Sequence, residues 1–152
     1  MEGFVESSPS RFFAVRLPHD GDLLEAIKGF AVRMGIEAGV LWVIGAVKRA
    51  TVSFYNQAEK TYSKHSFDEP MEILVCLGNV AKLKGETLIH AHIVLGNGNG
   101  KAFGGHLEKG TIIFSAEMFL LELKGVTLNR KYDETTGLNL FNFNLQNANP
   151  FT

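Results

Sequence analysis

Residues 86–107, ETLIHAHIVLGNGNGKAFGGHL, contain the pattern that best indicates how this chain folds. Counted with a period of two, residues 87–95 predict a strand with two different faces. One face would carry His90 and His92. The other face would belong to the core and consists of Thr87, Ile89, Ala91, Ile93 and Leu95. The glycines of residues 96–105 are flexible enough to fold the chain back, so that residues 103–107 can pair with this strand.

The length and composition indicate one folded domain. The 152 residues are 45% hydrophobic and 20% charged, which is ordinary for a globular protein and too apolar for intrinsic disorder. We expect a single domain over residues 1–152, with its core in about residues 11–140 and a mobile tail over residues 142–152.

The rest of the chain predicts one helix and many strands. The helix would begin near Asp22, which has Glu25 at the spacing of a capping box, and would end near Gly35. Residues 125–132 give a weaker strand signal, and a bulge or break is expected near Glu117. The stronger strand candidates are residues 11–17, 39–46, 51–55, 61–67, 71–77, 87–95 and 111–123. One principal helix packed on a mainly antiparallel sheet of about seven strands is an α+β domain.

Charge and cysteine content exclude several classes of protein. Fifteen Lys and Arg against sixteen Asp and Glu give a net charge of −1, so no large basic field exists to hold a nucleic-acid backbone. The single cysteine, Cys76, lies in an apolar run and excludes an intramolecular disulfide. No apolar stretch approaches the ~20 residues that span a bilayer, so we expect a cytoplasmic protein without a membrane partner.

Three histidines are candidate metal ligands. His90 and His92 would point the same way from one strand, with α-carbons roughly 6.5 Å apart, so both imidazoles can reach one ion. His106 joins them if residues 103–107 pair with that strand. Three histidines around an open coordination position are the arrangement in which zinc enzymes hold a reactive water. The alternative is three separate histidines satisfied by hydrogen bonds, and His19 and His65 are expected to be solvent-exposed.

Two acidic residues within apolar strands are candidate catalytic groups. Glu72 and Glu117 would be costly to bury unpaired, so each either faces solvent or another subunit, or pairs with a cation. Beside a metal, one of them could accept a hydrogen bond from an imidazole or act as general base for a metal-bound water. The glycine-rich segment does not predict a phosphate loop, because neither Gly-Lys-Ser/Thr nor a helix follows it.

Six short motifs follow one another along most of the chain. They are Glu72-Ile73-Leu74, Leu77-Gly78-Asn79-Val80, His90-Ala91-His92, Gly104-Gly105-His106-Leu107, Glu117, and Arg130 with Thr136-Gly137-Leu138. This ordered set resembles the PPC domain, the plant and prokaryote conserved domain, over about residues 11–140.

The resemblance implies a homotrimer in which one helix packs on a mainly antiparallel sheet. In plants, the PPC domain follows AT-hook motifs in nuclear DNA-binding proteins, where it supports self-association and partner binding. The AT-hook sequence Arg-Gly-Arg-Pro is absent from this chain, which argues against direct DNA binding. The three histidines resemble the prokaryotic pattern, which implies a metal site.

These observations support three hypotheses of function. The first is a homotrimeric binding or regulatory module that holds a divalent metal, most simply zinc, at His90, His92 and His106, with DNA or a DNA-binding protein as partner by family analogy. The alternative is a zinc-dependent hydrolase or lyase that uses metal-bound water, with Glu117 or Glu72 as base. The third is DNA recognition by the folded domain through small basic clusters, which are otherwise expected to be solvated surface: Lys48, Arg49, Lys82 and Lys84.

Overall fold

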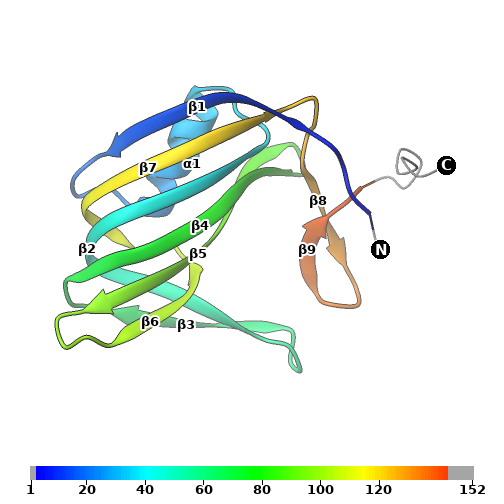
Figure 1. Ribbon diagram of the computed structural model, residues 1–152. Coiled ribbons are helices and arrows are strands. Elements are labelled where there is room, and N and C mark those ends of the chain that lie inside the picture. The colour runs from blue at the N-terminus through cyan, green and yellow to red at the C-terminus, as the bar shows by residue number, and fades with distance from the viewer. Residues whose placement is uncertain (1–2, 144–152) are drawn as a thin grey trace.

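The computed structural model describes residues 3–143, which form nine strands and one helix (Figure 1). The elements in chain order are β1 (Ser8–Leu17), α1 (Leu23–Arg33), β2 (Gly39–Asn56), β3 (Thr61–Phe67), β4 (Met71–Leu83), β5 (Glu86–Asn97), β6 (Ala102–Leu107), β7 (Ile112–Lys124), β8 (Asn129–Asp133) and β9 (Leu138–Phe141). Most of the tail predicted over residues 142–152 lies outside the described residues.

The strands form one mixed sheet in the order β1-β7-β2-β6-β5-β4-β8-β9, with β3 on β2 and an additional β2–β4 pairing. The pairings are antiparallel except for β4 with β8, which is parallel. One helix on a mostly antiparallel sheet agrees with the expected α+β class. The structure has nine strands rather than the expected seven or so: β6, β8 and β9 add three, and the candidates at residues 39–46 and 51–55 join into the single strand β2.

β2 accounts for another difference from the expected strands. The sequence pattern places separate strands before and after the charged residues Lys48 and Arg49, but β2 continues through them. Both side chains point outward between buried Val47 and Ala50, and the pairing with β7 shifts register there. A bulge therefore takes the place of the gap between the two expected strands. It lies opposite residues 112–115 of β7, a few residues from Glu117, near which a bulge or break was expected.

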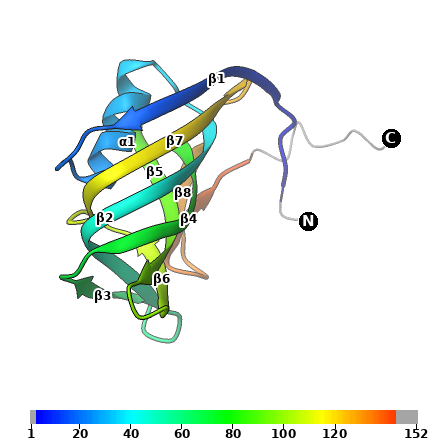
Figure 2. The same cartoon turned by 60° about the vertical axis from the view of Figure 1, so that its left-hand side comes forward.

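The helix α1 forms where the capping pattern predicts it. Glu25 donates its backbone N–H to Asp22 Oδ1 at 3.1 Å, and Gly35 adopts a left-handed φ of 65° just after the last turn. Leu23, Ile27 and Ala31 are completely buried against the sheet. The helix lies along one side of the sheet, and the core fills the space between them (Figure 2).

The opposite face of the sheet is apolar and exposed over much of its area. Direct cross-strand partners lie on the same face, and pairing joins Phe119, Trp42, Leu77, His92 and His106 in one row across β7, β2, β4, β5 and β6. We call this set the outer row. Trp42 is 41% exposed and Leu77 is 49% exposed. The outer row therefore runs from an apolar surface directly to two of the candidate ligands.

The single cysteine is buried, and the helix is too short to span a membrane. Cys76 is completely buried, and burial raises the pKa of its thiol to about 12, so it packs as a small apolar residue. Within residues 3–143, no helix has the length and apolarity needed to cross a membrane.

Candidate metal site and adjoining cavity

The hairpin of β5 and β6 brings the three candidate ligands together. His92 pairs directly with His106, and Leu95 pairs with Phe103, which confirms the expected pairing of residues 103–107 with the histidine strand. The turn between them is held by Asn97, whose side-chain Oδ1 accepts hydrogen bonds from the backbone N–H groups of Asn99 and Lys101.

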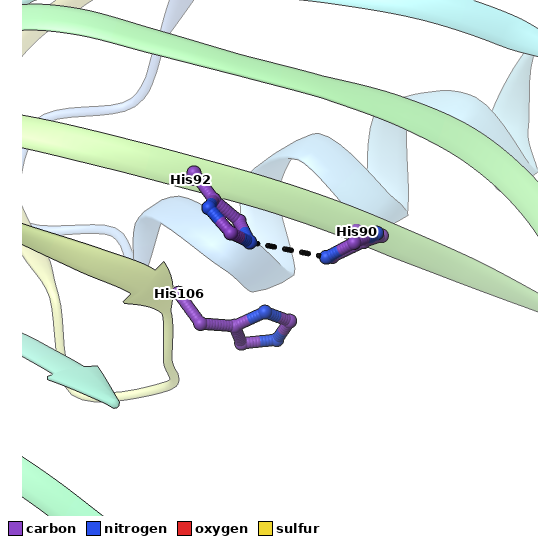
Figure 3. Close-up of side chains that lie close together, drawn as sticks. All are labelled: His90, His92 and His106. Carbon is purple, nitrogen blue, oxygen red and sulfur yellow. Dashed lines mark hydrogen bonds between the residues drawn. The ribbon is translucent and has the colours of Figure 1, made fainter. Parts of the chain in front are cut away.

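The imidazoles of His90, His92 and His106 converge on the outer face of the sheet (Figure 3). One ligand nitrogen from each ring lies within 4.8 Å of the others, and His90 Nε2 lies 3.3 Å from His92 Nε2. Nitrogens that bind one tetrahedral zinc at ~2.0–2.1 Å lie about 3.3 Å apart. The three nitrogens are therefore close enough to converge on one divalent ion after small side-chain movements.

Burial keeps two of the imidazoles uncharged. Burial, and after it the positive charge of Arg130, lowers the pKa of His90 to about 4. Burial is also the main reason that the pKa of His106 lies below its usual range. A neutral imidazole has one nitrogen without a proton, so at neutral pH neither ring has to lose a proton before it binds a metal.

A cavity of about 660 Å³ adjoins the histidines. It lies between the outer face of β5, the β2–β3 hairpin and the β8–β9 hairpin. Tyr55 Oη donates to the carbonyl of Thr136 at 2.7 Å, and Lys60 Nζ donates to the carbonyl of Glu134 at 2.7 Å, which ties the two hairpins together. Gly137 adopts a left-handed φ of 75°, and a Cβ there would lie 2.6 Å from Tyr55 Oη, so this contact requires glycine.

Arg130 reaches from β8 to the histidines. Its Nη2 donates to Asn79 Oδ1 and to His90 Nδ1, each at 3.1 Å, and its Nη1 donates to the carbonyl of Asn139 at 2.8 Å. The guanidinium also lies over the ring of Phe141, 4.4 Å from its centroid. The sequence motifs include Arg130, but nothing in its local sequence predicts a contact with His90.

The structure does not bring the predicted acidic residues to the histidines. Glu117 is exposed on β7 between Arg16 and Ile44, and Glu72 lines a separate hollow beside Lys48. The acidic residue on the wall of the 660 Å³ cavity is Glu108.

Glu108 is held by two partners from the β2–β3 hairpin. Ser53 Oγ donates to its Oε1 at 2.8 Å, and Lys64 Nζ lies 3.1 Å from its Oε2. Sequence reasoning missed Glu108 although it stands two residues after His106, where strand alternation places it on the same side of the chain.

Two of the four candidate basic residues are paired with acidic side chains. Lys48 forms an ion pair with Asp20, and Lys82 forms one with Glu37 at 3.4 Å. Acidic partners of this kind reduce the local positive potential, and the Lys82 side chain is only 17% exposed, so it is not the solvated surface residue that was expected.

Comparison with known proteins extends these observations. Residues 5–124 match the model of the Plants and Prokaryotes Conserved domain, abbreviated PCC or PPC. The chain is 29% identical over 129 residues to the bifunctional protein GlmU of a Synechococcus strain, covering 84% of this chain and 20% of GlmU. It therefore spans about a fifth of the length of the curated relatives it matches.

Three solved structures share the whole fold. A metal-containing protein of Archaeoglobus fulgidus is 36% identical, with a TM-score of 0.89 and coverage of 93% of this chain and 99% of its own. A plant- and prokaryote-conserved protein of Pyrococcus horikoshii is 35% identical, with a TM-score of 0.87 and coverage of 93% and 97%. A candidate DNA-binding protein of Bacteroides thetaiotaomicron is 28% identical, with a TM-score of 0.81 and coverage of 90% and 97%.

Proposed function

This chain belongs to the PPC domain family, and we propose that it is a cytoplasmic, homotrimeric module of that family that binds a divalent metal at His90, His92 and His106. The observation that carries the proposal is the convergence of three imidazoles, with ligand atoms within 4.8 Å of one another, on the wall of a cavity. Zinc is the metal we propose, because neutral imidazoles are among its preferred ligands and a three-histidine site leaves a fourth position open.

Elemental analysis tests the metal site directly. We expect about one zinc per chain in protein purified without an affinity tag, and none in a His90→Ala/His92→Ala variant. His19→Ala is the matched control, because His19 is exposed and binds the carbonyl of Phe114 far from the cluster. Absence of metal after incubation with zinc, or retention of zinc in the double variant, would contradict the proposal.

Self-association is supported by the apolar part of the outer row, and three copies are what the resemblance to the PPC domain implies. Phe119, Trp42 and Leu77 leave large side chains at the surface, and contiguous exposed apolar area of this kind marks association sites. We expect a sedimentation mass of three chains that falls on Trp42→Glu. Val32→Glu is the control, because Val32 is exposed on α1 on the other side of the sheet. A monomeric wild-type protein at micromolar concentration would contradict this part of the proposal.

A zinc-dependent hydrolase or lyase is the second candidate function. The cavity favours it, because three histidines leave a coordination position for water and the adjoining space can admit a substrate. Chromogenic esters and phosphate esters test the idea in zinc-loaded and zinc-free protein. Turnover that depends on zinc and disappears in His92→Ala is expected of an enzyme, and equal rates in all samples would leave only the binding module.

DNA association is the remaining partner proposal and rests on family analogy. One structural relative is a candidate DNA-binding protein, whereas this chain has a net charge of −1. A gel shift at low salt with AT-rich duplex tests it. Salt-sensitive binding reduced by Lys48→Glu would support it, and no shift would remove DNA from the list of partners.

A further inference from the structure

The charge of Arg130 is not neutralised by the residues around it. Its hydrogen-bond acceptors are Asn139, Asn79 and His90, all of them uncharged, and its buried Nε has no hydrogen-bond partner within residues 3–143. None of the ion pairs formed by the described residues includes Arg130. The acidic wall residue, Glu108, is already paired with Lys64. A partly buried guanidinium normally has an anionic partner, so this site favours a negatively charged ligand.

A metal bound at the histidines would strengthen the preference for an anionic ligand. Arg130 donates to His90 Nδ1, which places the single proton of the neutral ring on Nε2. An ion held where the Nε2 atoms of His90 and His92 converge requires the lone pair of His90 Nε2, so the proton must then lie on Nδ1. Two donors, His90 Nδ1 and Arg130 Nη2, would then face each other. An anionic oxygen that accepts from both would satisfy them.

The rest of the cavity is suited to an apolar or aromatic group. Its wall includes Leu88, Leu138 and Leu140, together with the rings of Tyr55 and Tyr62. The tyrosine rings lie 4.8 Å apart between centroids, and the Tyr62 ring lies 5.6 Å from that of His106. The volume of about 660 Å³ falls in the range of small-molecule sites.

We propose that this cavity binds a small organic anion, with its carboxylate or phosphate group on Arg130 beside the metal and its apolar body against Tyr62 and the neighbouring leucines. The inference rests on the proposed metal site and names the class of ligand that this site takes. Carboxylate and phosphate share the charged oxygens that a guanidinium recognises, and experiment can separate them.

Calorimetric titration of the zinc-loaded full-length chain tests the ligand class. Phenyl phosphate and benzoate are the two probes, and whichever binds identifies the anionic group. Inorganic phosphate and acetate lack the apolar body, and benzyl alcohol lacks the charge. We expect one site per chain for at least one probe, with affinity about 10-fold or more above that of the corresponding fragments.

Substitution of Arg130 tests its role. Arg130→Gln should weaken probe binding by about 10-fold to 100-fold, whereas Arg49→Gln, which removes an exposed arginine outside the cavity, should leave it unchanged. Tyr62→Glu provides a second variant, because Tyr62 is 47% exposed and a carboxylate there should repel the probe even if Arg130→Gln folds poorly.

Metal content measured on the same samples separates the two proposals. Zinc bound at one per chain with no binding of either probe would overturn the inference and leave the metal site standing. Probe binding that is unchanged in Arg130→Gln and in Tyr62→Glu would also overturn it. Absence of zinc would refute the proposed function, and Arg130-dependent binding to that metal-free chain would still support the anion site.

Discussion

The two faces of β5 differ in which parts of the chain pack against them. Ile89, Ala91, Ile93 and Leu95 face the core and are at most 5% exposed, because α1 covers them. His90 and His92 alternate with these residues on the same strand but are completed by β6 and β8, which lie elsewhere in the sequence. The apolar face needs only partners of suitable volume, whereas the histidine face needs particular atoms at particular positions.

The largest difference between the two faces should be seen in stability. Ile93→Ala is expected to lower the free energy of unfolding by about 2–5 kcal/mol, because Ile93 is 1% exposed and its removal leaves a cavity in the core. Val94→Ala is the control on the outer face of the same strand, where Val94 is 38% exposed, and should cost about 1 kcal/mol or less. Urea denaturation at fixed protein concentration measures both values. Similar losses for the two variants would contradict the division of β5 into a core face and a site face.

Metal should stabilise the protein through the histidine face alone. At free zinc of 100 times its dissociation constant, the wild-type protein should gain about 2.7 kcal/mol, because zinc binds the folded state. His92→Ala should lose this gain. Its metal-free stability should stay within about 0.5 kcal/mol of the wild type, because the side chain is exposed. Denaturation with zinc and with a chelator measures both. An equal zinc effect in the variant would place the metal elsewhere.

The contact between the β2–β3 and β8–β9 hairpins should stabilise both the fold and the wall of the cavity. Gly137→Ala should destabilise the protein by about 1–3 kcal/mol, since alanine is strained at a φ of 75° and its Cβ would displace the Tyr55 hydroxyl. Gly98→Ala is the control, because no atom lies within 4 Å of a Cβ there. The first variant should also weaken ligand binding in the cavity, which denaturation and calorimetry together detect. Equal behaviour of the two alanine variants would show that the hairpin contact does not matter.

The smallest expected effect lies at the edge of the sheet, away from both faces of β5. The hydrogen bond from Arg11 lowers the pKa of Glu122 to about 2, below the reference value of 4.5. When the pKa of a carboxyl is lower in the folded state than in the unfolded state, the group stabilises the protein at a pH above its unfolded-state pKa. That stability is lost as the pH falls from about 4.5 towards 2. Because Arg11 is exposed, the effect should be small.

Thermal unfolding across this pH range checks that prediction. Glu122→Gln should be less stable than the wild type at pH 7, and the difference should disappear near pH 2. Glu69→Gln, an exposed residue without such a pair among those described, serves as the control. A difference between Glu122→Gln and the wild type that persists unchanged at low pH would contradict the assignment to this ion pair.

Much of the local structure was predictable from short-range pattern. The capping pair Asp22 and Glu25 predicts the start of α1, and the alternation over residues 87–95 predicts which side chains of β5 are buried. These features depend on neighbours within a few residues, where backbone geometry limits the choices. The continuous strand through Lys48 and Arg49 was not predictable in this way, because a bulge depends on the strand opposite.

In the candidate site, too, some residues could be predicted from local sequence and others only from tertiary packing. His90 and His92 could be paired from their spacing, and His106 could be added on the condition that the chain folds back. The positions of Arg130 and Glu108 could not be predicted, since they depend on a parallel pairing of β8 with β4 and on the packing of the β2–β3 hairpin. The acidic candidates Glu72 and Glu117 stood out in sequence only because they interrupt apolar strands, which an exposed sheet face also explains.

By itself, the sequence determined the α+β class, the single helix, the core face of β5 and the identity of three candidate ligands, because periodicity and capping act through adjacent residues. Only the tertiary structure decided that these ligands share a wall with Arg130 and two tyrosines, and that Glu108 rather than Glu72 or Glu117 lies there. Those neighbours are separated by up to about half the chain, and contacts at such separation are set by strand order and register, which no local pattern specifies.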